Sequence, residues 1–485
     1  LRCPRIRRET GTTDVQEEQG SRGGDFQVSI QDDIQELSNK LNASQARLRE
    51  NLAYYDAEHR LKAIGVSVPP EMRALLAQVG WPRVYLSAIE ERSVLEGFRM
   101  GGSTEADARL WDWWQANNLD IESGPAHLEA LIHGVSYVTI STPDPADPLG
   151  DPNSPVITVE SPLNMYADID PQTRRVKRAF RPYVDPERPN EKRGTLYLPD
   201  RNVYLVGDVG GWRVEAEDVH NLGVPLVVPL VNRYKVGDIH GHSEITPELR
   251  SITDAAARIM MDMQAAAELM AVPQRLLFGV AQEALAASPD DPGSVIEAYF
   301  ARIIAVEDSD AHAMQFNAAD LINFVNVLQE LSKQAASYTG LPPQYLSFSS
   351  ENPASAEAIR SSESRLVKKV ERFNKLMGGG WEQVMRVAMM LMDGGTLAPE
   401  AYRMETIWRD PSTPTYAAKA DAVTKLVASG IIPVERARID LGYSEVERAE
   451  MRRWDSYSAV SQLSALLGSD PTSIPSPVTE EGEVS

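Results

Sequence analysis

The chain has almost no cysteine, because Cys3 is the single one among 485 residues. One thiol cannot close an internal disulfide, and a zinc site built from cysteines needs several of them. The sequence therefore excludes a disulfide scaffold and a zinc finger, and it favours folding in a reducing cytosol.

Basic residues are scarce relative to acidic ones. The chain carries 48 Lys and Arg against 70 Asp and Glu, which gives a formal charge of −22. Tight binding to a nucleic acid depends on clustered Lys and Arg that neutralise phosphates. The composition thus argues against a protein that binds nucleic acid tightly. Any role with DNA must be something other than tight binding.

Long apolar runs and nucleotide-binding motifs are also missing. The run at residues 224–231 is interrupted by proline and is far shorter than the roughly 20 residues of a membrane span. Residues 9–25 are polar and offer no apolar core for a signal peptide, so residues 1–25 are expected to form a flexible tail. The phosphate-binding loop of ATPases and the nucleophile elbow of hydrolases do not occur. We expect no membrane partner, no cofactor and no metal.

The residues that are present have an ordinary globular composition, 42% hydrophobic and 24% charged, over a length that suggests about three domains. Residues 30–65 and 70–78 have helical periodicity. The first of these segments carries an apolar stripe on one face, formed by Leu37, Leu41, Leu48 and Leu52. We expect surface helices with one buried side.

A short helix is predicted at residues 105–117, where Trp111, Trp113 and Trp114 cluster. Their neighbours are acidic, so we expect these rings to pack in the core and not to stack on bases. Between residues 134 and 232, alternation and β-branched residues predict a series of short strands. They are expected at residues 135–140, 156–160, 176–184, 195–198, 203–206 and 212–215. The whole pattern predicts an α+β fold that is mainly helical.

Two long helices with matching apolar seams are the most informative feature. Each seam advances in alternating steps of three and four residues, as in packed helices. Its members include Ile252, Ile259 and Met263 in the first helix, and Phe324, Leu328 and Leu331 in the second. Asp254 and Asp262 lie on a polar face off the first seam. The pattern suits a helical hairpin with a small αβ module at its tip, and it suits two ordinary core helices equally well.

The module would lie between the two helices. It holds two strand-like runs at residues 274–280 and 301–307, separated by a Pro/Asp loop and a short helix. After the second helix comes a polar loop of Ser347, Phe348, Ser349, Ser350, Glu351 and Asn352. Asn352 is suited to cap the next helix, since Pro353 favours the first helical position.

A third long helix is expected at residues 354–392. Its first half carries a basic stripe that includes Arg365, Lys368, Lys369 and Arg372. Such a stripe is a solvated face, the partner of an acidic surface, or a phosphate contact. Three consecutive glycines, Gly378, Gly379 and Gly380, are expected to interrupt the helix as a kink or hinge. Residues 415–467 are again helical with breaks at Pro433 and Gly442, and residues 469–485 are expected to be disordered.

One constellation has the residue types of a metal site. Asp238, His240, His242 and Glu244 alternate, so an extended strand would place all four side chains on one face. A polar connector ahead of the first long helix explains the same residues and is favoured, because the chain has seven His and no second cluster. The sequence does not predict an enzyme.

Four segments taken together in order resemble the portal proteins of tailed double-stranded DNA bacteriophages, of the SPP1 type found in siphophages of actinobacteria. They are residues 224–233, 267–275, 339–346 and 352–360, with the sequences VPLVVPLVNR, AELMAVPQR, TGLPPQYL and NPASAEAIR. The resemblance extends over residues 30–460. It implies a ring, in this family a dodecamer, at one capsid vertex around the channel through which DNA enters and leaves.

The resemblance also implies a division of the chain. The expected parts are an N-terminal tail (1–25), a wing (26–245), two stem helices (246–271 and 318–339), a clip (272–317), a tunnel loop (340–353), a long kinked wing helix (354–410), a crown (411–468) and an acidic tail (469–485). The loop from Ser347 to Asn352 would face DNA, and the helix seams would pack between subunits.

Further expectations follow from the same resemblance. The implied partners are the terminase large subunit, a head-completion or adaptor protein, and the major capsid and scaffolding proteins. The location is the virion, after assembly in the cytoplasm of a bacterial host. An acidic channel lining, with Asp254 and Asp262 as candidates, would repel the DNA backbone and let the duplex slide.

Two alternative functions stay open at this point. One is a metal-dependent nuclease or protease that uses the cluster from Asp238 to Glu244. The other is a helical adaptor that forms no ring.

Overall fold

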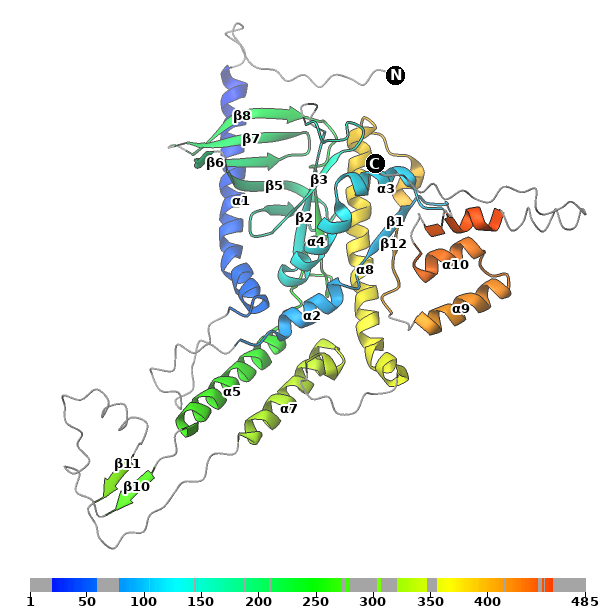
Figure 1. The fold of residues 1–485 in the computed structure, drawn as a ribbon. Helices are drawn as coiled ribbons and strands as arrows, with labels where there is room; N and C mark the ends of the chain where they lie inside the picture. The colour runs from blue at the N-terminus through cyan, green and yellow to red at the C-terminus, as the bar shows by residue number, and fades with distance from the viewer. Residues whose placement is uncertain are drawn as a thin grey trace, which may run out of the picture. The chain divides into compact units, whose positions relative to one another are not determined.

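The computed structural model divides the chain into two compact units, Leu1–Pro411 and Ser412–Ser485, and each is treated by itself. It describes residues 20–58, 78–103, 105–143, 145, 147–186, 188–208, 211–271, 275–278, 303–306, 321–346, 356–412, 416–443, 447–448 and 450–456. Figure 1 shows the helices and strands formed by these residues. The mixture of helix and sheet confirms the predicted α+β class.

In the first unit, helix α1, Gly20–Tyr55, lies along a five-stranded antiparallel sheet (Figure 1). The strands pair in sequence order, and their bounds are β4 Tyr166–Ile169, β5 Val176–Asp185, β6 Arg188–Tyr197, β7 Arg201–Asp208 and β8 Gly211–Val219. Ile34 and Leu37 of α1 pack against Phe180 and Leu196 of the sheet. Leu37, Leu41 and Leu48 of the predicted stripe are buried and Leu52 is half-buried. The helix begins within the segment predicted to be a flexible tail.

A second sheet has three strands in the order β3-β2-β9. Their bounds are β2 Val135–Ser141, β3 Val156–Glu160 and β9 Val227–Val231. The central strand β2 is buried over nearly its whole length, because both α4, Leu119–His133, and the long helix α8, Ala356–Met392, pack against it. All six predicted strands exist, although β6, β7 and β8 are longer than expected.

Helix α8 runs without interruption through Gly378, Gly379 and Gly380, so the prediction that these glycines interrupt it is wrong. A side-chain carbon at Gly378 would overlap Thr406 Oγ1 of strand β12, Glu405–Trp408, and one at Gly380 would overlap Leu230 Cδ2 of β9. At Gly379 it would meet no atom of the described residues within 4 Å. Gly378 and Gly380 therefore let two strands approach the helix closely. A residue without a side chain permits such a close approach as well as a hinge.

Aromatic rings pack tightly beside α8. Trp114 of helix α3, Ala108–Ala116, meets Trp381 edge to face with ring centroids 4.9 Å apart, and it meets Phe98 in the same way at 5.6 Å. Trp113 and Trp114 are buried, and Trp111 is half-buried and stacks on Trp114. The prediction that the tryptophans anchor a core is confirmed.

Two long helices extend from the rest of the first unit, which we call the body, and lie side by side (Figure 1). They are α5, Pro247–Ala271, and α7, Ile322–Thr339, and both were predicted. The two strand-like runs between them are also confirmed, since β10, Arg275–Phe278, pairs in parallel with β11, Ile303–Val306. The short helix predicted between these strands lies outside the described residues.

The remaining elements of the first unit are short. They are α2 Trp81–Glu90, β1 Leu95–Arg99, which pairs antiparallel with β12, and two single-turn 3-10 helices, Pro343–Tyr345 and Pro399–Arg403. Among the described residues, none of the helices combines the length and the apolar character needed to cross a membrane.

The second unit contains α9, Tyr416–Ala428, and α10, Val434–Leu441, which pack on each other. Pro433 precedes α10, and Gly442 ends it with a left-handed φ of 95°. Both predicted helix breaks are therefore confirmed. Residues 457–485, which include the predicted acidic tail, lie outside the described residues.

Candidate functional site: the helix pair and the polar joint at its base

The α5–α7 pair is held together by small and medium apolar side chains. Ala256, Ala257 and Met260 of α5 form one cluster with Leu328 and Leu331 of α7. The sequence predicted a strict seven-residue seam through Ile259 and Met263, but the buried positions continue instead through Met261 and Ala265. A straight α-helix has 3.6 residues per turn, so its contact stripe drifts away from a seven-residue repeat.

That drift leaves apolar residues outside the intrachain contact. Ile259, Met263 and Phe324 are half-buried, while Ile252 is buried against the body of the first unit. On α7, Val325 and Val327 are 42% and 44% exposed, although sequence analysis had not singled them out. The pair therefore presents apolar surface that this chain does not cover within its described residues.

The two acidic candidates differ in their surroundings. Asp254 is half-buried, and both of its carboxylate oxygens lie 3.1 Å from the Tyr54 hydroxyl of α1, which donates to them. Burial first, and then the Asp254 charge, raise the pKa of Tyr54 to about 12. Asp262 lies two turns further along α5, beyond this contact, and is also half-buried. Asp254 is therefore held by a partner of its own chain.

The predicted DNA-facing residues Ser347 to Asn352 lie outside the described residues, but the two ends of their loop are described. Before the loop, the Tyr345 hydroxyl donates to the Glu363 carboxylate of α8 at 2.8 Å. Arg92 donates to both groups, at 3.0 Å to Tyr345 and 3.2 Å to Glu363. The three side chains thus tie the chain just before the loop to the helix just after it.

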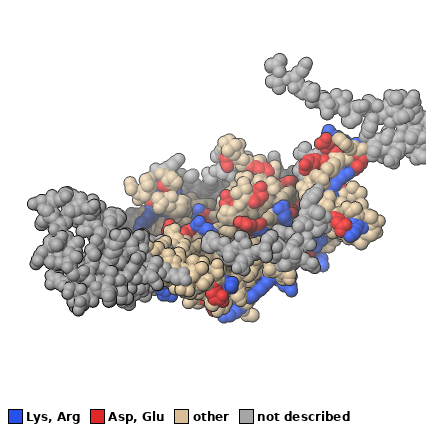
Figure 2. Space-filling view, turned by 60° about the horizontal axis from the view of Figure 1, so that its bottom comes forward, with Lys and Arg blue, Asp and Glu red and all other residues tan. Residues whose placement is uncertain are grey.

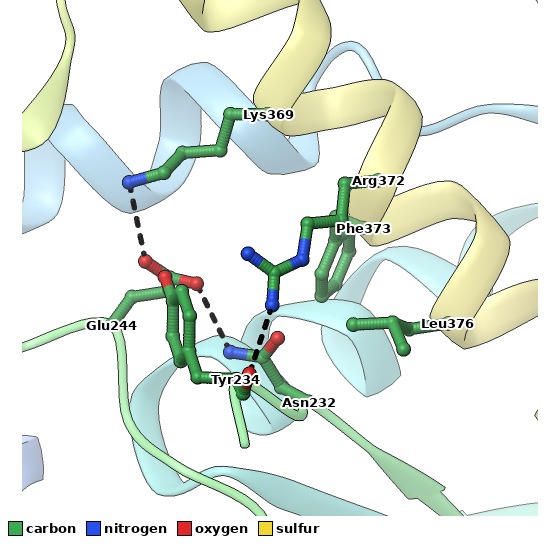
Figure 3. Close-up of a pocket in the computed structure, with 7 residues that line it drawn as sticks. All are labelled: Asn232, Tyr234, Glu244, Lys369, Arg372, Phe373 and Leu376. Carbon is green, nitrogen blue, oxygen red and sulfur yellow. Dashed lines mark hydrogen bonds and ion pairs between the residues drawn. The ribbon is translucent and has the colours of Figure 1, made fainter. Parts of the chain in front are cut away.

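A polar cluster joins the helix pair to the rest of the first unit, and Figure 3 shows all of its members except Tyr85 around a small cavity. We call this cluster the polar joint: Tyr85, Asn232, Tyr234, Glu244 and Lys369. Glu244 is 5% exposed, and it accepts from the Tyr85 hydroxyl at 2.6 Å and from the Asn232 amide at 3.1 Å. The Lys369 ammonium lies 3.5 Å from the same carboxylate.

Lys369 connects the ends of both helices of the pair. Its ammonium donates to the Tyr85 hydroxyl and, at 3.2 Å, to the Thr339 carbonyl at the C-terminal end of α7. Glu244 precedes the first residue of α5 by only three positions. One charged group on α8 thus contacts the chain where α5 begins and where α7 ends.

The charges of the joint depend on one another. Burial alone would raise the pKa of Glu244, but the Lys369 charge and hydrogen bonds from Tyr234, Tyr85 and Asn232 outweigh it and hold that pKa below its ordinary value. Burial lowers the pKa of Lys369, and Glu244 opposes this shift. Removing either partner would leave a charge in a poorly hydrated place, which costs several kcal/mol.

The local sequence explains how Glu244 reaches this position. Gly134, with φ of 96°, ends α4, and Gly241, with φ of 79°, lies directly against it. A side chain at Gly241 would overlap the carbonyl of Gly134, so the connector between β9 and α5 can cross here only as glycine. The Glu244 amide then donates to the Leu131 carbonyl at 2.9 Å, which fixes its side chain toward α8.

The four side chains of the predicted basic stripe have different surroundings. Arg365 donates to the Ser337 carbonyl at 3.0 Å, so Arg365 and Lys369 both bind carbonyls in the last turn of α7, where cations are favoured by the helix dipole. Arg372 donates to the carbonyls of Arg233 and Tyr234. Lys368 is exposed. Three of the four cations therefore make contacts within the chain.

The residues of the hypothetical metal site do not converge. Glu244 belongs to the polar joint, and the His240 ring lies tilted against the Tyr166 ring. His242 Nδ1 lies 2.7 Å from the Ser243 carbonyl, and Asp238 accepts from the Lys235 amide. In the described part of the chain, no three His, Cys, Asp or Glu side chains lie as they would around a metal ion. The connector between β9 and α5 is irregular, so the alternation that suggested a single face does not apply.

Comparison with known proteins agrees with this architecture. The model of the family described as phage portal protein, SPP1 Gp6-like, matches residues 34–459. The chain therefore belongs to the SPP1 Gp6-like family of phage portal proteins. It is 55% identical to the portal protein of Mycobacterium phage D29 over 431 residues, which are 88% of this chain and 89% of that protein. It is 54% identical to the portal protein of Mycobacterium phage L5 over the same shares.

The family inferred from sequence and its portal function are thus confirmed, and the nuclease, protease and adaptor alternatives are not supported. Sequence reasoning missed most of the polar joint and all of the Arg92, Tyr345 and Glu363 cluster. Only Glu244 and Lys369 had been named, each for another reason. The partners of both clusters are distant in sequence, so no local spacing could reveal them.

Proposed function

We propose that copies of this chain form a closed ring, a dodecamer, at one vertex of the phage capsid, and that double-stranded DNA passes through its centre without sequence-specific contacts. The observation that carries the proposal is the family match over residues 34–459. We propose a structural role without catalysis, in the virion, after assembly in the cytoplasm of the bacterial host.

The finer assignments follow the order of the elements. We assign α5 and α7 to the stem, the segment with β10 and β11 to the clip, α8 to the long wing helix and the second unit to the crown. The clip would meet the terminase large subunit during packaging and a head-completion or adaptor protein afterwards. The wing would meet the capsid and scaffolding proteins.

Exposed apolar side chains on the pair support a stem packed between neighbours. Val325 and Val327 are exposed, and Ile259, Met263 and Phe324 are half-buried. A ring closes when one patch of a subunit meets a different patch of the next, so these side chains would be covered on assembly. Such burial contributes roughly 25 cal/mol for each Å² of apolar surface removed from water.

The channel charge is a further part of the proposal. Acidic side chains such as Asp262 would repel the DNA backbone and keep it from adhering to the wall. On the face seen in Figure 2, acidic and basic side chains are interspersed.

The location of a labelled copy of the chain in phage particles tests the proposal. Electron microscopy of particles that carry a tagged copy should find the label at a single vertex. Label spread over many vertices, or absent from filled particles, would contradict the portal role.

The DNA-facing loop has its own test. Deleting residues 347–351 should stop DNA packaging, measured as nuclease-protected DNA, while rings still form. Normal filling of capsids would show that this loop does not contact the passing duplex.

A further inference from the structure

A group of cations surrounds the connector between β9 and α5. We call it the basic loop patch: Arg174, Arg233, Lys235 and Arg372, together with Val236 at the tip of the connector. Arg372 donates from α8 to the Arg233 carbonyl at 3.0 Å and to the Tyr234 carbonyl at 3.4 Å, and its guanidinium lies over the Tyr234 ring. Arg174 donates from the turn between β4 and β5 to the Val236 carbonyl at 3.0 Å.

Two of these cations, Arg174 and Arg372, are held in place without being neutralised. They donate to backbone carbonyls, which fix a guanidinium but carry no net charge. Among the described residues none of the four makes an ion pair, although Asp238 lies near Arg233. Burial and the Arg174 charge lower the pKa of Arg233, and Asp238 opposes them. The charges of Arg174 and Arg233 therefore lie close enough to repel each other.

Other arginines of the first unit form ion pairs with carboxylates. Arg178 pairs with Asp33 and Glu36, and Arg193 pairs with Glu215. In a chain with 70 acidic and 48 basic residues, carboxylates are the common partners of arginine. A preordered group of cations with no such partner is suited to binding an anion from outside, because little side-chain entropy is left to lose.

The apolar tip indicates what kind of molecule carries that anion. Val236 is 82% exposed, follows Lys235 in the chain and has its carbonyl bound by Arg174, so a phosphate backbone bound there would leave its side chain uncovered. Protein interfaces combine an apolar contact with a surrounding rim of charge. The arrangement thus favours an acidic protein surface over DNA.

We propose that the basic loop patch docks on a carboxylate-bearing surface of the neighbouring copy of this chain. The inference rests on the proposed ring, which brings a second copy of a strongly acidic chain against each subunit. Because each copy has a charge of −22, subunits repel one another unless basic patches meet acidic ones. A heterologous contact of this kind also fixes the order in which subunits join.

The experiment compares ring assembly of the wild type, the double variant Lys235→Glu/Arg372→Glu and the control Arg213→Glu. Lys235, Arg372 and Arg213 are all exposed, and Arg213 lies on β8, outside the patch. Assembly is measured by mass photometry over a concentration series, at about 0.1 M salt and at about 1 M salt, where the screening length falls to about 3 Å. Unfolding midpoints check that each variant is folded.

We expect the double variant to need a roughly tenfold or higher concentration for half-assembly, while the control assembles like the wild type. High salt should weaken ring assembly of the wild type. It should also reduce the difference in half-assembly concentration between the wild type and the double variant. The milder variant Val236→Ser, at an exposed tip, should weaken assembly in the same direction without changing the unfolding midpoint.

Other outcomes overturn the inference. Equal assembly of the double variant and the wild type would exclude the patch from the interface. Normal rings that lose retention of a double-stranded DNA fragment would assign the patch to DNA instead. A wild type that forms no rings at any concentration would contradict the proposed function itself, which is a separate result.

Discussion

The body around α8 and the α5–α7 pair are built from similar apolar residues, yet they bury them differently. In the body, Trp114 and Trp381 are fully enclosed. On the pair, Val325 and Val327 remain more than two-fifths exposed, and Met263 is half-buried. The aromatic core beside α8 is buried within the single chain, whereas the pair leaves apolar side chains exposed that we propose are covered on assembly. The polar joint lies at the boundary between the two regions.

The largest effect is expected at that boundary, from Lys369→Met. This change leaves the Glu244 carboxylate buried without its ammonium partner, so the free energy of unfolding should fall by about 3–5 kcal/mol. Urea unfolding followed by tryptophan fluorescence measures the loss. A value within about 0.5 kcal/mol of the wild type would show that the body and the pair do not depend on this ion pair.

The same joint should give the protein an acid-sensitive stability. Because the folded-state pKa of Glu244 lies below its ordinary value of 4.5, its contribution is present above that pH and is lost as the pH falls through the folded pKa. Glu244→Gln removes the titration, so its stability should depend less on pH below 4.5. Parallel pH profiles of the wild type and the variant would contradict the assignment.

A smaller effect is expected within the body, at the three glycines of α8. Gly380→Ala places a methyl group against Leu230, so it should destabilise the protein by about 1–3 kcal/mol. Gly379→Ala is the matched control, because that position is open and alanine is the better helix former by about 1 kcal/mol. Thermal unfolding of the two variants should shift in opposite directions. Equal shifts would favour the hinge that the sequence suggested.

The smallest effect on stability is expected on the pair, from Val325→Ser. Its side chain is 42% exposed, so the unfolding free energy of the single chain should change by less than about 0.5 kcal/mol. Ring assembly should nevertheless weaken, because the covered surface of the neighbour loses an apolar contact. Ala335→Ser, at a fully buried position of the same helix, should instead lower stability. If Val325→Ser assembled normally, the pair would not be the uncovered surface of this account.

Local patterns in the sequence predicted most helices and strands, because alternation and helical stripes report which side of an element is buried. They missed several elements, which are α2, α4, β1, β4, β9 and β12. Among these, α4 is buried on most sides and contains Pro125, and β9 carries Pro229, which is tolerated at the edge of its sheet. They also predicted wrongly that the glycines of α8 interrupt the helix, since glycine occurs both at hinges and where another backbone or side chain approaches closely. Pattern alone cannot separate these two uses.

The site was less predictable than the fold. The helix pair followed from its seam, but the drift of that seam to Met261 and Ala265 depends on the straightness of the helix. The polar joint depends on contacts such as that between Glu244 and Lys369, 125 residues apart. Such pairs become visible only when the fold brings them together.

The most direct test of the central claim is negative-stain imaging of the purified chain over a range of concentration and salt. The account predicts that the purified wild-type chain forms closed rings with a central channel in the absence of other phage proteins. Monomers or dimers under every condition would contradict it.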